Sequence, residues 1–425
     1  MDGGEAPPAR AQPVEDRAPH PLTARLLAEN PVFQRHPVCP APPHRAQLPY
    51  LAGDGPRINI WSLLKNHIGQ DFWRITMPIE LNEPMSMLQK TAEVLEFAHL
   101  LRAANACEDS LDRLAQVMAF FYSVIPYSIQ RLKKPFNPLL GETFELVEGD
   151  LRFLVEQVSH HPPVAAFHGE SDDFVLFGHL RISLSVSLSG LVVSTGGPLR
   201  VTLKRTGETF SYARTKTSLN NLVMGSMYLW HFGPAELLNE TTGERFLLDF
   251  KQKGWLRGSK PLCDGSVLRA DGSVAFTAKG KWSHYLKISD AKGVERTLFV
   301  KPGMPPDAEK MYNFSAFCVN LNHLTPEALA RVPPTDSRLR PDQRAYEFGS
   351  FALAAEEKAR LETRQRQRRA EAEKAGAAPV PQWFEQLPGE GDLPDYRFNG
   401  RYFQARETGL WPADTPDLFN AVAEG

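Results

Sequence analysis

Hydrophobic positions along the chain change from a helical spacing to an alternating one near residue 138. Before that point, apolar residues at helical spacing predict helices over about 84–104 and 109–125. After it, apolar and polar residues alternate strictly from Leu180 to Leu188, which predicts a strand with one solvated face. Turn signals such as Asp264-Gly265 recur from residue 143 to about 300. The pattern therefore predicts a meander of antiparallel strands, large enough to curl into a barrel.

The two ends of the chain differ from this central region. Residues 1 to about 55 are rich in Pro, Ala and Arg without a sustained period, which predicts a disordered leader. Residues 58–76 are amphipathic, and two interpretations stay open: a helix packed on the domain, or a lid or membrane-touching helix. Residues 350–374 predict a highly charged helix. The apolar positions of the amphipathic segment are Trp61, Leu64, Ile68, Phe72 and Ile75.

Composition limits the kinds of partner that the chain can have. Lys and Arg number 48 against 50 for Asp and Glu, so no overall basic field draws the protein to nucleic acid or acidic membranes. Any anion site must therefore be local. The four cysteines form no CxxC pair, which argues against a zinc ribbon and fits a reducing compartment. Without a secretory signal or a sufficiently long apolar run, we expect a cytoplasmic protein that contacts membranes only peripherally and transiently.

The most unusual stretch runs from Glu156 to Pro163 and reads EQVSHHPP. Neighbouring histidines in a regular strand point to opposite faces. The two prolines cannot continue a strand ladder, so His160 and His161 can converge where a strand ends. Two such imidazoles suit a phosphate, which would hold them protonated near neutral pH. The simpler alternative is one core and one exposed histidine; zinc is disfavoured because adjacent residues rarely chelate and no HExxH is present.

A second unusual stretch runs from Lys134 to Glu142 and reads KPFNPLLGE. Its prolines fix the backbone around Asn137, and Gly141 permits a tight bend. Lys134 could serve a phosphate and Asn137 a hydroxyl, although a surface lysine and a turn asparagine are the default interpretations.

Together these two stretches resemble the fingerprint of the oxysterol-binding protein-related family. The resemblance extends to IWSLLKNHIG at residues 60–69, MYNFS at 311–315, PTDSRLRPDQR at 334–344 and PDLF at 416–419. It covers about residues 57–420, which leaves only the leader outside it.

The family resemblance implies a role for each matching residue. His160 and His161 would hold the 4-phosphate of phosphatidylinositol 4-phosphate, with Lys134 and Asn137 as further headgroup contacts. A cluster on the charged helix would complete the site, at Lys358, Glu362 and Arg366. These three residues also share one helical face, since each step of four residues drifts only about 40°. Without the resemblance they would be interpreted as a solvated ladder of ion pairs.

The resemblance also implies the fold, which would be mainly β with added helices (α+β). An incomplete antiparallel β-barrel would enclose an apolar lipid tunnel, closed by residues 58–76 as a lid. The expected division is a leader at 1–55 and one lipid-binding domain at 56–425, comprising a helical region at 77–130, the barrel at 131–320 and a carboxy-terminal helical region and tail at 321–425. Relatives often read GKLW where this chain reads GSMY at residues 225–228, so Ser226 stands in place of their lysine. We see no motif for tethering to the endoplasmic reticulum in the sequence.

The function implied is lipid transfer, with phosphatidylinositol 4-phosphate exchanged between membranes against a second lipid, which we expect to be a sterol. The alternatives are a lipid sensor or scaffold, or a carrier of phosphatidylserine instead of sterol. No cofactor, metal or nucleic acid is expected. An enzyme is not expected either, because the three Cys-x5-Arg sequences, at 39–45, 107–113 and 263–269, lack the backbone N–H loop leading into a helix that a phosphatase requires.

Overall fold

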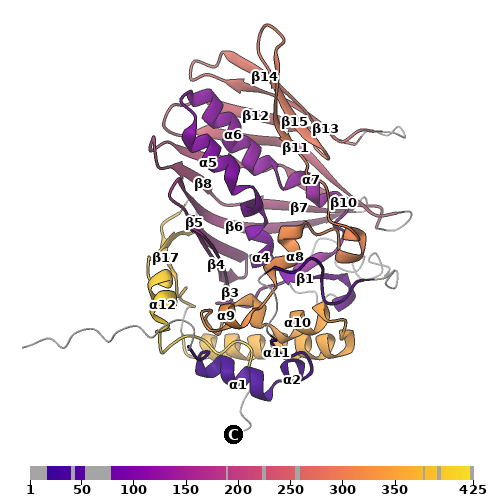
Figure 1. The fold of residues 1–425 in the computed structure, drawn as a ribbon, viewed down its shortest axis with the longest axis vertical. Coiled ribbons are helices and arrows are strands. Elements are labelled where there is room, and N and C mark those ends of the chain that lie inside the picture. Colours follow the sequence, from indigo (N-terminus) through magenta and orange to yellow (C-terminus); the bar gives the residue numbers. More distant parts are fainter. Residues whose placement is uncertain are drawn as a thin grey trace, which may run out of the picture.

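The computed structural model describes residues 17–39, 44–52, 78–187, 190–222, 226–253, 259–376, 379–389 and 394–421. Its centre is one antiparallel sheet of 14 strands, which runs along the long axis of the molecule (Figure 1). The predicted mainly β fold is therefore confirmed. The strands are β3 (Thr143–Glu148), β4 (Leu151–His160), β5 (Pro163–Glu170), β6 (Phe174–Ser187), β7 (Gly190–Gly196), β8 (Leu199–Leu203), β9 (Thr209–Ala213), β10 (Lys216–Asn220), β11 (Tyr228–Asn239), β12 (Arg245–Phe250), β13 (Leu262–Leu268), β14 (Val274–Lys281), β15 (Tyr285–Ser289) and β16 (Glu295–Val300).

Neighbours in the sheet are mostly neighbours in the sequence, as in a meander. The order is β16-β15-β14-β13-β12-β11-β10-β7-β6-β5-β4-β3, while β8 and β9 bridge β6 and β11 beside this path. The predicted solvated face is present on β6, where Ser183 and Ser185 are exposed and Leu180 is buried. The prediction of a turn at Asp264-Gly265 is wrong, because both residues lie within β13. A Cβ at Gly265 would collide with the carbonyl oxygen of Leu247, so the glycine permits close approach of β12.

Helices cover one face of the sheet. In Figure 1, α5 (Ala98–Ala106) and α6 (Ser110–Tyr122) lie in front of it, and Phe121 of α6 stacks on Tyr212 of β9 at 4.5 Å. The helices predicted at 84–125 are present in shorter pieces: α4 (Met87–Ala92), the 3-10 helix η5 (Glu93–Phe97), α5, α6 and α7 (Ile125–Ser128). Residues 84–86 instead belong to β1 (Asn82–Ser86), which pairs in parallel with β2 (Lys134–Phe136). A capping box between Ser86 and Gln89 starts the helix at Met87.

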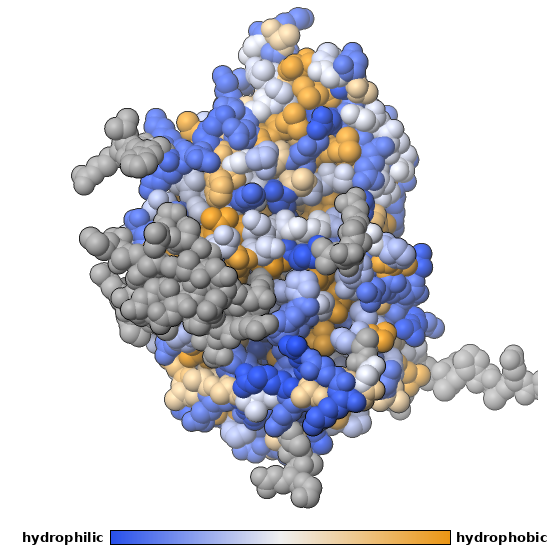
Figure 2. All heavy atoms as spheres, turned by 180° about the vertical axis from the view of Figure 1, so that it is seen from behind, coloured by the Kyte–Doolittle hydropathy of each residue, from blue (hydrophilic) through white to orange (hydrophobic). Residues whose placement is uncertain are grey.

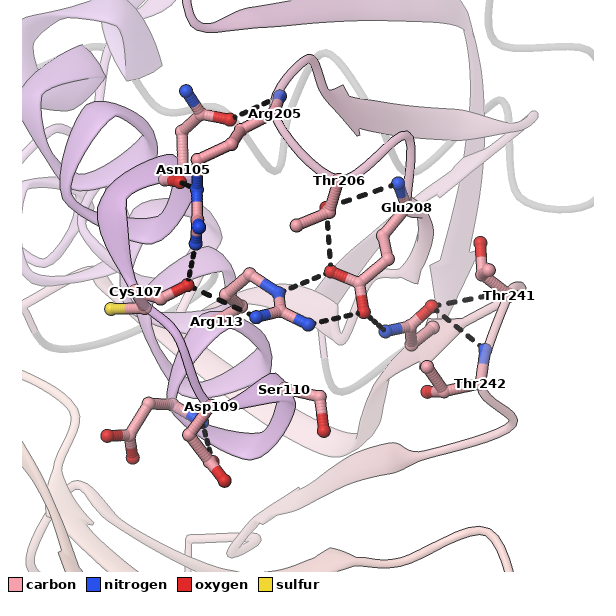
Figure 3. A network of polar contacts seen from close by, with 12 residues as sticks. Asn105, Cys107, Asp109, Ser110, Arg113, Arg205, Thr206, Glu208, Thr241 and Thr242 are labelled. Atoms are coloured by element: carbon pink, nitrogen blue, oxygen red, sulfur yellow. Dashed lines mark hydrogen bonds and ion pairs between the residues drawn. The ribbon is translucent and has the colours of Figure 1, made fainter.

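A polar network fixes the turn between α5 and α6 to the sheet (Figure 3). The guanidinium of Arg113 donates to both carboxylate oxygens of Glu208, with Nη2 and Oε1 2.8 Å apart, and to the carbonyl of Cys107. Asn239 and Thr206 also donate to Glu208. The ion pair is buried, so removing either partner would leave an uncompensated charge.

Part of the segment predicted to be a disordered leader is folded. Residues 17–39 contain α1 (Pro21–Glu29) and α2 (Pro31–Arg35), and Leu26, Val32 and Phe33 are buried. The prediction is wrong there because a few well-placed apolar residues pack on other helices despite the polar composition. The missed signals are local: Asn30 caps α2 and each helix has proline at its first position.

At the base of the molecule in Figure 1, α1 and α2 from the amino-terminal part lie together with α10 (Pro341–Glu347) and α11 (Phe351–Lys374) from the carboxy-terminal part. The charged helix predicted at 350–374 is confirmed as α11. No helix within the described ranges is long and apolar enough to cross a membrane. The remaining elements are the 3-10 helices η4 (Ile79–Leu81), η6 (Ala308–Met311) and η7 (Ser337–Leu339), the helices α8 (Ala316–Leu321), α9 (Pro326–Leu329), α10 (Pro341–Glu347), α11 (Phe351–Lys374) and α12 (Tyr402–Thr408), and the hairpin of β17 (Phe384–Leu387) and β18 (Asp395–Phe398).

Candidate functional site

The two neighbouring histidines converge at the end of β4. The pairing of β4 with β5 shifts register between Gln157 and Ser159, and such a bulge re-aims the side chains that follow it. The Ser159 hydroxyl donates to the carbonyl of Pro162 at 2.7 Å, which closes the turn beyond the strand. The imidazole rings of His160 and His161 consequently lie 4.7 Å apart, at 75° to each other. The bulge and the turn together bring onto one side two rings that a regular strand would separate.

A buried ion pair fixes the loop that begins at Lys134. Glu142 accepts hydrogen bonds from the backbone N–H of Leu139 and from Arg340, both at 2.9 Å. The same Arg340 nitrogen donates to the carbonyl of Asn137 at 2.7 Å. The N–H of Gly141, which has φ +81°, donates to the carbonyl of Gln157 and so joins the loop to β4. The loop is therefore held rigidly beside the histidines.

Helix α11 presents four polar side chains to these two segments. Lys358 forms an ion pair with Glu362 at 2.6 Å, Gln365 contacts His160 at 2.8 Å, and Arg369 contacts His161 at 3.4 Å. Their spacing of four, three and four residues keeps all of them within about 60° of one another around the helix. Lys358 is only 12% exposed, so the interpretation as a solvated ladder of ion pairs does not describe it.

Gln365 connects all three segments of the site. Its Oε1 accepts from the backbone N–H of Leu140 at 3.1 Å, while its amide nitrogen contacts Nε2 of His160. The loop, the end of β4 and α11 therefore meet at a single side chain.

The electrostatics of the cluster favour an anion. Burial lowers the pKa of Lys134 to about 8, with a smaller contribution in the same direction from Lys358, while Glu362 opposes it. Lys134 has no ion-pair partner among the described residues. Burial also lowers the pKa of His160 to about 4, helped by His161 and Arg369, so this ring is neutral near pH 7 in the free protein. The sequence predicted protonated histidines only for the phosphate-bound state, and for that state protonation stays a prediction.

Two small cavities adjoin the cluster. His160, Asn137 and Gln157 line one of them. Asn137 and Gln157 also line the other, of about 20 Å³, together with the apolar side chains of Met87, Ala165, Leu180 and Ile182. The polar site thus adjoins an apolar wall formed by α4, β5 and β6. The apolar tunnel stays a prediction, since its expected cover at 58–76 lies outside the described residues, as do the lid positions Trp61, Leu64, Ile68, Phe72 and Ile75.

The structure places most of the predicted site residues together. His160, His161, Lys134, Lys358 and Glu362 form one cluster, with the exposed Asn137 at its edge. Arg366 is exposed on α11 and donates to the hydroxyl of Thr363 at 2.9 Å, so its headgroup role remains a prediction.

Sequence reasoning missed Gln365 and Arg369. Counting only in steps of four from Lys358 led to Arg366, whereas a 3.6-residue repeat also selects positions seven and eleven residues further along. That repeat, applied to α11, could have identified both residues.

In the rear view of Figure 2 the lower part of the surface, where α11 lies, is largely hydrophilic.

Cys107 and Cys263 do not resemble activated nucleophiles. Burial raises the pKa of the Cys263 thiol to about 12, and burial together with Asp112 raises that of Cys107. Reactive cysteines need the opposite shift. Among the described residues, no group of three or more His, Cys, Asp or Glu side chains is arranged to hold a metal ion.

Comparison with known proteins agrees with this geometry. The family model described as oxysterol-binding protein matches residues 59–407. The chain is 32% identical over 432 residues to mouse oxysterol-binding protein-related protein 2, covering 88% of each chain. It is 34% identical to oxysterol-binding protein homolog 1 of Saccharomyces cerevisiae, with 89% of this chain and 34% of the yeast protein covered. The chain thus spans about a third of that relative, and 44% of mouse oxysterol-binding protein-related protein 1.

Solved structures extend the similarity to the fold. The ORD domain of Osh1 in complex with ergosterol matches with a TM-score of 0.81 and 31% identity, covering 95% of this chain and all of that one. The ORD of Osh3 from Saccharomyces cerevisiae in complex with PI(4)P matches with a TM-score of 0.76 and 32% identity, over 87% of this chain and 97% of that one. By its sequence and its fold, this chain belongs to the oxysterol-binding protein family of lipid-binding proteins.

Proposed function

We propose that this protein transfers lipids between membranes, binding phosphatidylinositol 4-phosphate through its headgroup and exchanging it for a sterol. The observation that carries the proposal is the convergence of Lys134, Lys358, His160 and His161 beside an apolar wall. A cationic cluster that adjoins apolar side chains fits a ligand with an anionic head and a hydrocarbon body.

The chemistry of the cluster suits a phosphate monoester in particular. Lys134 and Lys358 repel each other in a poorly solvated setting, and Glu362 offsets only part of that repulsion. A multiply charged phosphate would relieve the repulsion and accept hydrogen bonds from both histidines. We assign Asn137 and Arg366 to the rest of the headgroup, at the edge of the site.

The choice of second lipid follows the relatives. Osh1 was solved with ergosterol and with cholesterol, and Osh3 with PI(4)P. We therefore propose a sterol as the exchanged cargo and residues 58–76 as the lid that covers it. A covered cargo leaves little apolar surface in water, and burial of that surface is worth about 25 cal/mol per Å².

Extraction from liposomes tests the proposal. His160→Ala with His161→Ala should abolish extraction of phosphatidylinositol 4-phosphate while sparing extraction of cholesterol. The matched control replaces two exposed histidines, His99 and His284, with alanine and should leave both activities intact. Unchanged phosphoinositide extraction by the first variant would refute the assignment of His160 and His161 to the headgroup. Selective extraction of phosphatidylserine by the wild type would identify phosphatidylserine, and not a sterol, as the second cargo.

Turnover separates a carrier from a sensor. With donor and acceptor liposomes in excess, a carrier moves many lipids per protein molecule, whereas a sensor or scaffold saturates near one. We expect many, because the proposed function forms and breaks no covalent bond and returns the protein to its initial state.

A further inference from the structure

The backbone fixes the orientation of the Gln365 amide. The N–H of Leu140 can only donate, and it lies 3.1 Å from the Gln365 oxygen. The amide nitrogen must therefore be the atom that faces Nε2 of His160, at 2.8 Å. A primary amide nitrogen donates hydrogen bonds and does not accept them. Nε2 of His160 is consequently the acceptor in this contact and carries no proton.

The remaining proton of His160 is then defined. A neutral imidazole with an unprotonated Nε2 carries its proton on Nδ1. The charged groups facing the ring are His161, Arg369 and Glu362; the first two act with burial against protonation, and Glu362 opposes them. Near neutral pH the ring thus has one N–H group, at Nδ1.

That N–H group is unused in the free protein. Nδ1 of His160 is buried and makes no hydrogen bond within the part of the chain that the structure describes. A buried donor without an acceptor costs free energy, which an incoming acceptor would recover. The cavity lined by His160, Asn137 and Gln157 measures about 10 Å³, which is room for about one water molecule.

We propose that Gln365 is a positioning residue that keeps the proton of His160 on Nδ1 in the free protein, so that the neutral ring presents an N–H donor to an incoming phosphate oxygen. The ligand in this statement rests on the proposed function, whereas the tautomer of the free protein does not. A phosphate suits such a donor because its oxygens only accept, and a free phosphate and a lipid headgroup share that chemistry.

Three variants of α11 in the full chain separate this role from a merely structural one. Gln365→Glu keeps an acceptor for the Leu140 N–H but presents His160 with a carboxylate, which can only accept. Gln365→Leu removes both contacts. Gln367→Glu introduces the same charge at an exposed position about 200° away around the helix, and serves as the control.

The direct readout is the tautomer, measured by long-range ¹⁵N–¹H correlation on histidine-labelled protein at pH 7.4, with His160→Ala identifying the signal. We expect the Nδ1–H form in the wild type and in Gln367→Glu. In Gln365→Glu we expect the Nε2–H form or the imidazolium, and in Gln365→Leu a mixture. A wild type with its proton on Nε2, or a Gln365→Glu spectrum identical to that of the wild type, would overturn the proposal.

Binding to vesicles with phosphatidylinositol 4-phosphate, and to inorganic phosphate, provides the second readout. Losing one good hydrogen bond predicts about tenfold weaker binding by Gln365→Glu, and less than twofold change in Gln367→Glu. Equal weakening in both glutamate variants would mean that charge alone acts, and would count against the positioning role. A wild type that has the Nδ1–H form but ignores phosphoinositide vesicles would overturn the proposed ligand and leave the tautomer assignment supported.

Discussion

Replacing Lys134 with methionine should stabilise the free protein while destroying its anion site. Burial lowers the pKa of this lysine from 10.5 to about 8, so the folded state disfavours the charge. At about 1.4 kcal/mol per pKa unit the cost of this change is about 3.5 kcal/mol, and the remaining solvent contact of the half-buried side chain reduces it to roughly 2 kcal/mol. Methionine keeps the length and the apolar stem and removes the charge.

The expected gain depends on pH in a defined direction. Between about pH 8 and 10.5 the unfolded chain holds a proton on Lys134 that the folded chain has lost, so the stability of the wild type rises across this window. Lys134→Met lacks this rise. The variant should therefore exceed the wild type by roughly 2 kcal/mol at pH 7, and the difference should vanish near pH 10.5.

Urea unfolding followed by fluorescence measures the difference, with the midpoint compared at constant slope. Lys292→Met, an exposed lysine in the turn between β15 and β16, is the control and should show no pH-dependent difference. The same Lys134 variant should bind vesicles with phosphatidylinositol 4-phosphate at least about tenfold more weakly, since a charge-assisted hydrogen bond is lost. A less stable variant at pH 7, or a difference that does not change with pH, would refute the reasoning.

Three further predictions concern the sheet, the tail and the lid. Arg113→Leu and Glu208→Leu should each cost about 3–5 kcal/mol, because one buried charge is left unpaired, whereas the double variant should recover much of the loss; additive costs in a double-mutant cycle would contradict this. Burial raises the pKa of Glu156 to about 7 although the backbone N–H groups of Gln382 and Trp383 donate to it. Between about pH 4.5 and 7 the folded chain thus binds a proton on Glu156 that the unfolded chain releases, so stability should fall as pH rises through that window. In a series of denaturation measurements at different pH values, Glu156→Gln should reduce the slope of the unfolding free energy against pH. An unchanged slope would exclude Glu156 as a source of this pH dependence. Deleting residues 58–76 alone, which keeps the folded helices α1 and α2, should speed the loss of bound sterol. Equal dissociation rates of the deletion variant and the wild type in a stopped-flow measurement would contradict a gating role for residues 58–76.

Much of the site could be predicted from the sequence because most of its polar residues lie within short sequence motifs. The prolines after His161 and those flanking Asn137 break regular structure, and such breaks hold functional side chains in fixed loops. The charges of α11 follow the helical repeat, which is a local property of the chain. Alternation of polar and apolar residues likewise predicted the β-rich centre, since the side-chain period of a strand is two.

Tertiary structure decided which of these local features meet. Nothing near Gln365 in the sequence shows that its amide joins Leu140 to His160, because that contact spans about 205 residues. The register shift in β4 that aims both imidazoles to one side depends on pairing with β5. The pKa of Lys134 depends on burial under α11 and on Lys358, neither of which a linear pattern contains. The sequence by itself thus determined the residue types and the elements that carry them, whereas their convergence and protonation arose only from long-range packing, which removes water and brings distant charges together.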